Sequence, residues 1–128
     1  MEDPYSKAMD AIFALETGDL LKRGAVKEFY LILTRIVRGY LTEVFNVNII
    51  DMTTSETVRE LKTAGIVKKD LSICRDFFVF ADLVKFAKHI PSDSDISSSL
   101  EEAKEIIQLG HVDSCPPQIP VKNFQENK

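Results

Sequence analysis

The strongest constraint on the fold is a long helical pattern of apolar residues that runs from about residue 24 or 25 to Phe45. One face of this predicted helix carries Val26, Phe29, Leu33, Ile36, Tyr40 and Val44. Leu31 and Ile32 are apolar on other sides, which is typical of a helix that several neighbours cover. We therefore expect residues 25–45 to form the central helix of an all-α bundle. Gly39 costs about 1 kcal/mol relative to Ala inside a helix, which predicts either close helix packing or a mild kink there.

Local capping signals divide the chain into five predicted helices. Asp3 is a suitable N-cap because its carboxylate can accept from free N–H groups of the first turn, and Pro4 fits the next position. Thr53 and Glu56 have the spacing of a capping box, in which each side chain bonds the backbone N–H of the other residue. The fourth helix is predicted to end before Pro91, and the sequence leaves open whether a kink precedes its last part. The predicted helices cover residues 4–17, 24–45, 53–64, 69–90 and 92–110.

The length of 128 residues and the 45% hydrophobic content are those of one globular domain. We expect a single compact bundle of about five helices over residues 1–110. Residues 111–128 contain three prolines and several polar side chains, which predicts an extended or disordered tail. The most apolar run, residues 77–87, contains Asp82 and Lys85 and is too short to span a membrane. The acidic N-terminus lacks the apolar run of a signal peptide, so we expect none.

Charge is unevenly distributed along the chain, whose formal net charge is −4. Residues 20–91 carry a net charge of +4, whereas the segments on both sides are acidic. The basic residues are less dense than those of a typical nucleic-acid-binding stripe, so we expect no nucleic-acid partner. The mildly basic middle of the chain is instead a candidate interaction surface. Its seven candidate residues are Lys22, Arg23, Lys27, Arg59, Lys62, Lys68 and Lys69.

The sequence contains no recognisable catalytic, nucleotide-binding or metal-binding motif. His89 and His111 are its only histidines, and neither has metal-ligand spacing with Cys74 or Cys115. We interpret both histidines as surface residues at helix ends, Cys74 as a small core residue, and Cys115 as a thiol of the tail. Two cysteines are too few for a disulfide framework and indicate a reducing compartment. We therefore expect no metal, no cofactor and no catalytic residue.

Asp82 is an acidic residue in the most apolar segment of the chain. Burying a carboxylate is costly unless it is paired or caps a helix. One hypothesis is an ion pair with Arg38, whose planar guanidinium suits a carboxylate. A second is that Asp82 caps a helical turn over residues 83–88, after a break in the fourth helix. A third is that its side chain faces water.

Four short motifs follow one another along the chain. They are Phe29-Tyr30-x-x-Leu33-Thr34, Arg38-x-Tyr40-Leu41, Thr53-Thr54-x-Glu56 and Asp82-Leu83-Val84-Lys85-Phe86-Ala87. Their combination resembles the cytoplasmic helical domain of BatD-type bacterial proteins, which are associated with aerotolerance, and of a related family of small membrane-anchored proteins. The resemblance covers residues 5–108. Gly39 departs from it, because such sequences usually carry a larger polar residue there.

The resemblance implies a non-catalytic, cytoplasmic interaction module of a membrane-anchored bacterial protein at the inner membrane. It implies MoxR-type AAA+ ATPases and von Willebrand factor A-domain proteins as partners, and it transfers no catalytic residue. Anionic lipid headgroups are a further possible target of the basic surface. A small-ligand-binding or enzymatic domain is the first alternative, and it requires a polar pocket near Tyr30, Tyr40 and Phe77. A helix-turn-helix DNA-binding unit over residues 54–78 is the second alternative.

Overall fold

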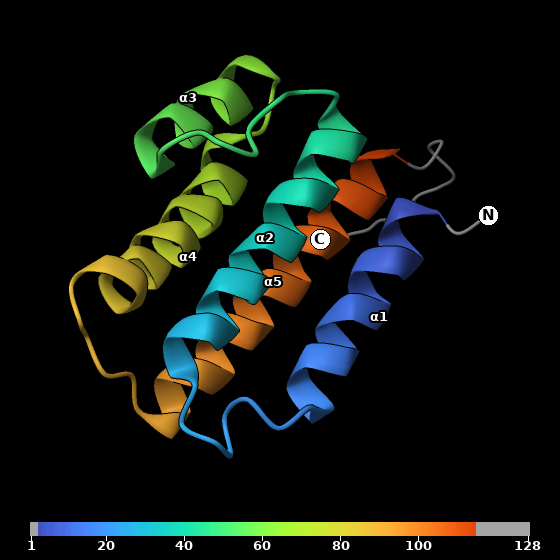
Figure 1. Cartoon of the computed structure of the whole chain (residues 1–128). Helices are drawn as coiled ribbons and strands as arrows, with labels where there is room; N and C mark the ends of the chain where they lie inside the picture. Colours follow the sequence, from blue (N-terminus) through green and yellow to red (C-terminus); the bar gives the residue numbers. More distant parts are fainter. Residues whose placement is uncertain (1–2, 115–128) are drawn as a thin grey trace, which may run out of the picture.

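The computed structural model describes residues 3–114, which form five α-helices and no strand. Figure 1 shows these helices packed into a bundle, which confirms the predicted all-α class. Short connections of four to eight residues join them. The helices are α1 (Pro4–Thr17), α2 (Val26–Phe45), α3 (Thr54–Thr63), α4 (Lys68–Phe86) and α5 (Asp93–Ser114).

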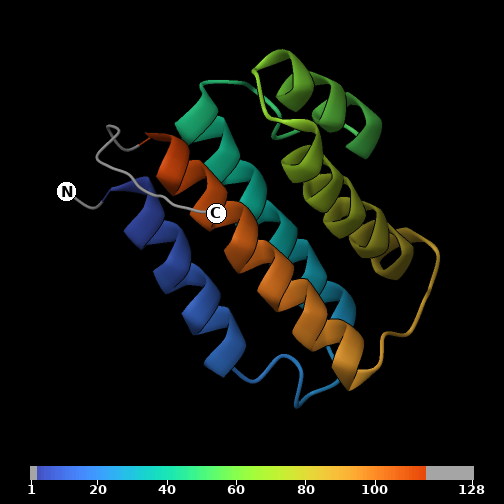
Figure 2. The same ribbon diagram turned by 180° about the vertical axis from the view of Figure 1, so that it is seen from behind.

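Two parallel helices, α2 and α5, lie side by side at the centre of the bundle (Figures 1 and 2). Helices α1 and α4 flank this pair on opposite sides, and α3 packs mainly on α4. The expected central helix is therefore one half of a central pair. It is also less enclosed than predicted, because Leu31 and Arg35 on its outer face are exposed.

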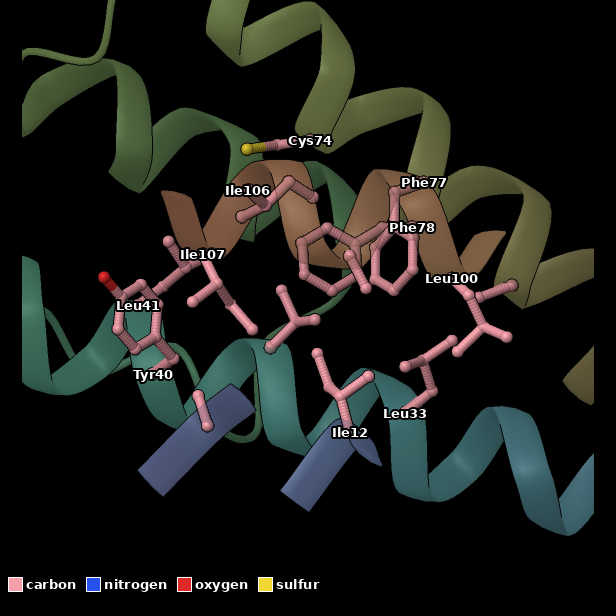
Figure 3. Close-up of a cluster of buried hydrophobic side chains, with 14 of the residues drawn as sticks. Ile12, Leu33, Tyr40, Leu41, Cys74, Phe77, Phe78, Leu100, Ile106 and Ile107 are labelled. Carbon is pink, nitrogen blue, oxygen red and sulfur yellow. The ribbon is translucent and has the colours of Figure 1, made fainter. Parts of the chain in front are cut away.

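The hydrophobic core fills the space between the central pair and its two flanking helices (Figure 3). Phe77 and Phe78 of α4 are fully buried, and their rings meet edge to face with centroids 5.1 Å apart. Ile12 of α1 and Ile107 of α5 are also inaccessible to solvent. Aromatic and branched side chains dominate this core, and burial of each contributes about 1.5–3 kcal/mol to folding.

Two side-chain contacts set the register of α2 against α5. The Tyr30 hydroxyl donates to Ser99 Oγ at 2.8 Å, and both residues are buried. Ten residues further along α2, the ring of Tyr40 lies directly against the backbone of Gly110 in α5. The two contacts are separated by similar lengths of helix on both partners, as the parallel direction of the pair requires.

Helix α5 extends beyond its predicted end. We expected Gly110 to end the helix, but α5 continues to Ser114, so residues 111–114 are helical. A Cβ atom on Gly110 would lie 2.6 Å from Tyr40 Cε2, so glycine is required there for packing. Residues 115–128, which include Cys115, lie outside the described residues.

The predicted caps are confirmed where the signal is local. Asp3 Oδ1 accepts from the N–H of Ser6 at 2.7 Å. Thr53 and Glu56 form the complete capping box at the start of α3.

Two other local predictions have different outcomes. Helix α4 continues without a break to Phe86, and a Cβ atom on Gly39 would have no neighbour within 4 Å. Close packing at Gly39 was therefore a wrong prediction.

Candidate functional site

An open cavity of about 480 Å³, lined by both charged and apolar side chains, lies where α2, the segment 46–53, the start of α3 and the end of α4 meet. We call it the Arg38–Lys85 cavity after the two basic side chains in its wall. Its lining combines charged groups with apolar side chains at its edge. The residues that matter below are Arg38, Ile50, Thr54, Asp82, Lys85 and Phe86.

Arg38 joins three parts of the fold and is only 8% exposed. Its Nη1 donates to the carbonyl oxygen of Ile49 at 3.2 Å and to Thr57 Oγ1. The guanidinium carbon lies 4.5 Å from the centre of the Phe78 ring, which is a cation–π arrangement. Arg38 of α2 therefore holds the 46–53 segment and α3 in place.

Asp82 has partners other than the predicted one. Its Oδ2 accepts from the Thr54 hydroxyl at 2.6 Å, and its Oδ1 lies 3.9 Å from Lys85 Nζ. Within residues 3–114 it forms no direct ion pair with Arg38, but its charge raises the pKa of that guanidinium, so the two groups interact without direct contact. The unbroken α4 excludes the capping role, and a side chain 35% exposed does not simply face water.

Lys85 is the residue that sequence reasoning missed. Its side chain is 8% exposed, and its Nζ donates to Thr34 Oγ1 at 3.3 Å. A signal was present, because Cys74, Phe78, Ala81 and Lys85 have the spacing of one helix face, and the first three are apolar. A lysine at the end of such a row is placed on the buried side of the helix.

Three charges control the electrostatics of the cavity. Burial lowers the pKa of the Arg38 guanidinium, and the charge of Asp82 opposes this effect. Burial also lowers the pKa of Lys85, Asp82 again raises it, and the charge of Arg38 lowers it further. Arg38 and Lys85 are therefore close enough to repel each other, and Asp82 is the acidic group that acts on both. A second carboxylate, that of Asp51, lines the cavity at an exposed position.

The seven residues of the predicted basic surface are all exposed, but they do not form one surface. Lys22, Arg23 and Lys27 lie around the start of α2, whereas the others lie on α3 and at the start of α4. These two groups are at opposite ends of the bundle (Figure 1). Arg23 also forms an ion pair with Asp19 at 3.2 Å.

The other predicted positions lie mainly in the core. Cys74 is buried as predicted, and burial, with a smaller effect from Asp70, raises the pKa of its thiol to about 12. Tyr30 and Phe77 are also fully buried, so the alternative ligand pocket does not lie between them. Tyr40 instead borders a groove of about 210 Å³ between α1 and α2.

The exposed side of α4 carries an unexpected row of apolar residues. Val79, Leu83 and Phe86 are 45%, 43% and 73% exposed, and their spacing places them on one face of the helix. We call this row the α4 apolar face. It lies on α4 directly after residues 54–78, the stretch that was considered as a DNA-binding unit. Phe86 also lines the Arg38–Lys85 cavity, so the two features adjoin.

Within residues 3–114, no cluster of three or more histidine, cysteine or acidic side chains has an arrangement that could hold a metal ion. None of the described helices combines the length and the apolar run that a membrane crossing requires. A scan against models of known protein families finds no match to this chain, and searches of curated proteins and of solved structures find none either.

Proposed function

We propose that this chain is a non-catalytic protein-interaction module of a membrane-anchored bacterial protein, and that it binds its partner through the α4 apolar face. The resemblance to BatD-type proteins suggests a MoxR-type AAA+ ATPase or a von Willebrand factor A-domain protein as that partner. It also suggests a position on the cytoplasmic side of the inner membrane. Enzymatic, ligand-binding and DNA-binding functions remain the competing classes.

The α4 apolar face carries this proposal. Single exposed apolar residues are common on protein surfaces, but a continuous row is typical of contact sites. Val79, Leu83 and Phe86 form such a row on a helix whose opposite side already packs in the core. A partner that covered them would gain about 25 cal/mol for each Å² of apolar surface removed from water.

The chain offers a matched pair of substitutions for the test. Phe86 of α4 and Phe13 of α1 are 73% and 66% exposed, and their helices lie on opposite sides of the bundle. The binding of the MoxR-type ATPase and of the von Willebrand factor A-domain protein from the same bacterium would be measured by calorimetry. We expect Phe86→Asp to weaken binding about tenfold or more, as for a central contact residue, and Phe13→Asp to have little effect.

Two outcomes would contradict the proposal. If neither protein binds the wild-type chain, the suggested partners are wrong. If Phe86→Asp binds as tightly as the wild type, the α4 apolar face is not the contact surface. Circular dichroism of both variants would establish that a loss of binding does not arise from unfolding.

A further inference from the structure

A further open cavity, of about 380 Å³, lies at the end of the bundle where α2 begins and α4 ends. Three parts of the chain form its wall: the start of α2, the last turn of α4 and the connection from α4 to α5. Sites for small ligands have volumes of about 300–1,000 Å³, so this cavity is large enough for one. We call it the Lys27–Lys88 cavity after two of the basic residues in its wall.

The wall of the Lys27–Lys88 cavity is positively charged. Among the residues that the structure describes, no carboxylate lines it, whereas four basic side chains do: those of Lys27, Lys85, Lys88 and His89. Asp82, outside the wall, lies 3.9 Å from Lys85 Nζ. Asp95, also outside the wall, interacts electrostatically with His89. Lys27 and Lys88 form no ion pair within residues 3–114, so the fold leaves two positive charges at this cavity without a counter-charge.

Lys88 stands where the backbone favours glycine. It lies just after the end of α4, and its φ angle of 59° is in the left-handed region. The residue that ends a helix in this conformation is usually glycine, because a Cβ atom is strained there. The next N–H, that of His89, donates to the carbonyl oxygen of Leu83 at 3.0 Å, and this contact does not need the lysine side chain. A lysine that costs backbone strain favours a role for its charge at the cavity.

We propose that the Lys27–Lys88 cavity binds a phosphate monoester. Such a group carries a charge of about −1.5 to −2 near pH 7, which matches the two lysines that lack a counter-charge. Lysine binds phosphate as a point charge and needs no fixed geometry for it. Ile90 also lines the cavity and is 86% exposed, so it can contact the organic part of the ester. The inference is independent of the proposed function, because no residue of the α4 apolar face lines this cavity.

A titration with two probes of similar size tests the charge that the cavity accepts. Phenyl phosphate has two negative charges at pH 7.5, and phenyl sulfate has one. Their binding would be followed by NMR at low salt, through the backbone amides of Lys27, Lys88 and His89. We expect phenyl phosphate to shift these signals with millimolar affinity. We also expect it to bind about threefold to fivefold more tightly than phenyl sulfate, as for one more charge contact at an exposed site.

Vesicles distinguish a lipid source of the monoester from a soluble one. Phosphatidic acid has a monoester headgroup, whereas the phosphate of phosphatidylserine is a diester. Co-sedimentation would compare vesicles of the two lipids matched for total charge. Tighter adsorption to phosphatidic acid that phenyl phosphate reverses would assign the cavity to the lipid headgroup. Equal adsorption to both, with phenyl phosphate still bound in the titration, would assign it to a soluble ester.

Two matched pairs of variants locate the binding site. Lys88→Gly removes a charge and relieves the backbone, so we expect it to weaken phenyl phosphate binding about fivefold and to raise the midpoint of urea denaturation. Asn46→Gly makes the same change at the left-handed residue after α2, outside the cavity, and we expect unchanged binding. Lys27→Gln is compared with Lys22→Gln, an exposed lysine near the same end that does not line the cavity. We expect only Lys27→Gln to weaken binding.

Four results would overturn the inference. They are no detectable binding of phenyl phosphate, equal affinity for phenyl phosphate and phenyl sulfate, unchanged binding by Lys88→Gly, and equal losses from Lys27→Gln and Lys22→Gln. The last result would mean that the general positive charge of this end, rather than the cavity, attracts the probe. Because Lys88→Gly is expected to be more stable than the wild type, a loss of binding by this variant would not arise from unfolding.

Discussion

Gly110 and Gly39 both lie inside helices, but the first is crowded and the second is not. This difference decides whether a substitution by Ala lowers or raises the stability of the fold. A Cβ atom on Gly110 would overlap the ring of Tyr40, which is 3% exposed and cannot move freely. A Cβ atom on Gly39 would enter open space beside α1. Neither glycine has a positive φ angle, so the local backbone suits Ala at both.

We expect Gly110→Ala to lower the free energy of unfolding by about 1–2 kcal/mol, because the cost of overpacking exceeds the gain in helix propensity. We expect Gly39→Ala to raise the free energy of unfolding by up to about 1 kcal/mol. Urea denaturation followed by circular dichroism measures both. A Gly110→Ala protein more stable than the wild type would mean that the Tyr40 ring is not held in place.

At the scale of elements, α3 is the least anchored helix. It has ten residues and packs mainly on α4, where Thr54 donates to Asp82, and Arg38 of α2 donates to Thr57. An isolated helix of this length is not stable in water. We therefore expect α3 to open locally more often than α2 or α5.

Loss of the capping box tests this expectation. We expect Thr53→Ala to lower stability by about 1 kcal/mol and to speed hydrogen exchange in α3. The control is Thr63→Ala, the same change at an exposed residue of the last turn of α3. Hydrogen exchange followed by NMR would separate the helices. Faster exchange spread equally over α2 and α5 would show that α3 does not open separately.

Signals that act over a few residues were sufficient to predict most helix boundaries. The caps at Asp3 and Thr53 each involve a residue three positions away, so the sequence contains the whole interaction. The role of Gly110 could not be predicted in this way, because its partner Tyr40 is seventy positions earlier in the chain. For the same reason a glycine within α5 was interpreted as the end of that helix.

At the scale of the whole molecule, the parallel pairing of α2 and α5 was also beyond prediction from sequence. Short connections favour antiparallel neighbours, and α2 meets α5 only after the chain has passed through α3 and α4. The Arg38–Lys85 cavity is likewise lined by residues that lie far apart in the sequence. Arg38 and Asp82 were candidates for a mutual ion pair, but the hydrogen-bond partners of both come from segments that only the folded chain brings together.

The buried thiol of Cys74 causes the stability of the whole fold to fall at alkaline pH. Its pKa rises from 9.0 to about 12 in the folded state, so above pH 9 the unfolded chain loses this proton first. The unfolded state then binds fewer protons than the folded state, and stability falls as the pH rises. Between pH 9 and 10.5 this loss is about 2 kcal/mol.

Comparison with Cys74→Ala isolates this effect, because Tyr30 and Lys85 titrate in both proteins. We expect the variant to be less stable at pH 7, where it lacks the buried sulfur, and the difference to shrink by about 2 kcal/mol at pH 10.5. Denaturation at a series of pH values measures this. A difference that does not change with pH would mean that the thiol ionises normally in the folded protein.

The two groups of basic residues lie at opposite ends of the bundle, so we expect their contributions to any anionic surface to be independent. Helix α2 has 20 residues, which places them about 30 Å apart, well beyond the screening length of about 8 Å at physiological salt. We expect Lys22→Glu/Lys27→Glu and Lys68→Glu/Lys69→Glu to weaken adsorption to phosphatidylserine vesicles by amounts that add within about 0.5 kcal/mol. Co-sedimentation measures this adsorption. A combined variant that departs from the sum would indicate one surface spanning both ends.

The paired contacts between α2 and α5 have a mechanical consequence. A slide of one helical turn, about 5.4 Å, would separate Tyr30 from Ser99 and force the Tyr40 ring against a bulkier part of α5. These two contacts therefore oppose sliding of α2 along α5. Both contacts would have to break before α2 and α5 could slide along each other, so the relative position of the two central helices is fixed at two points along their contact.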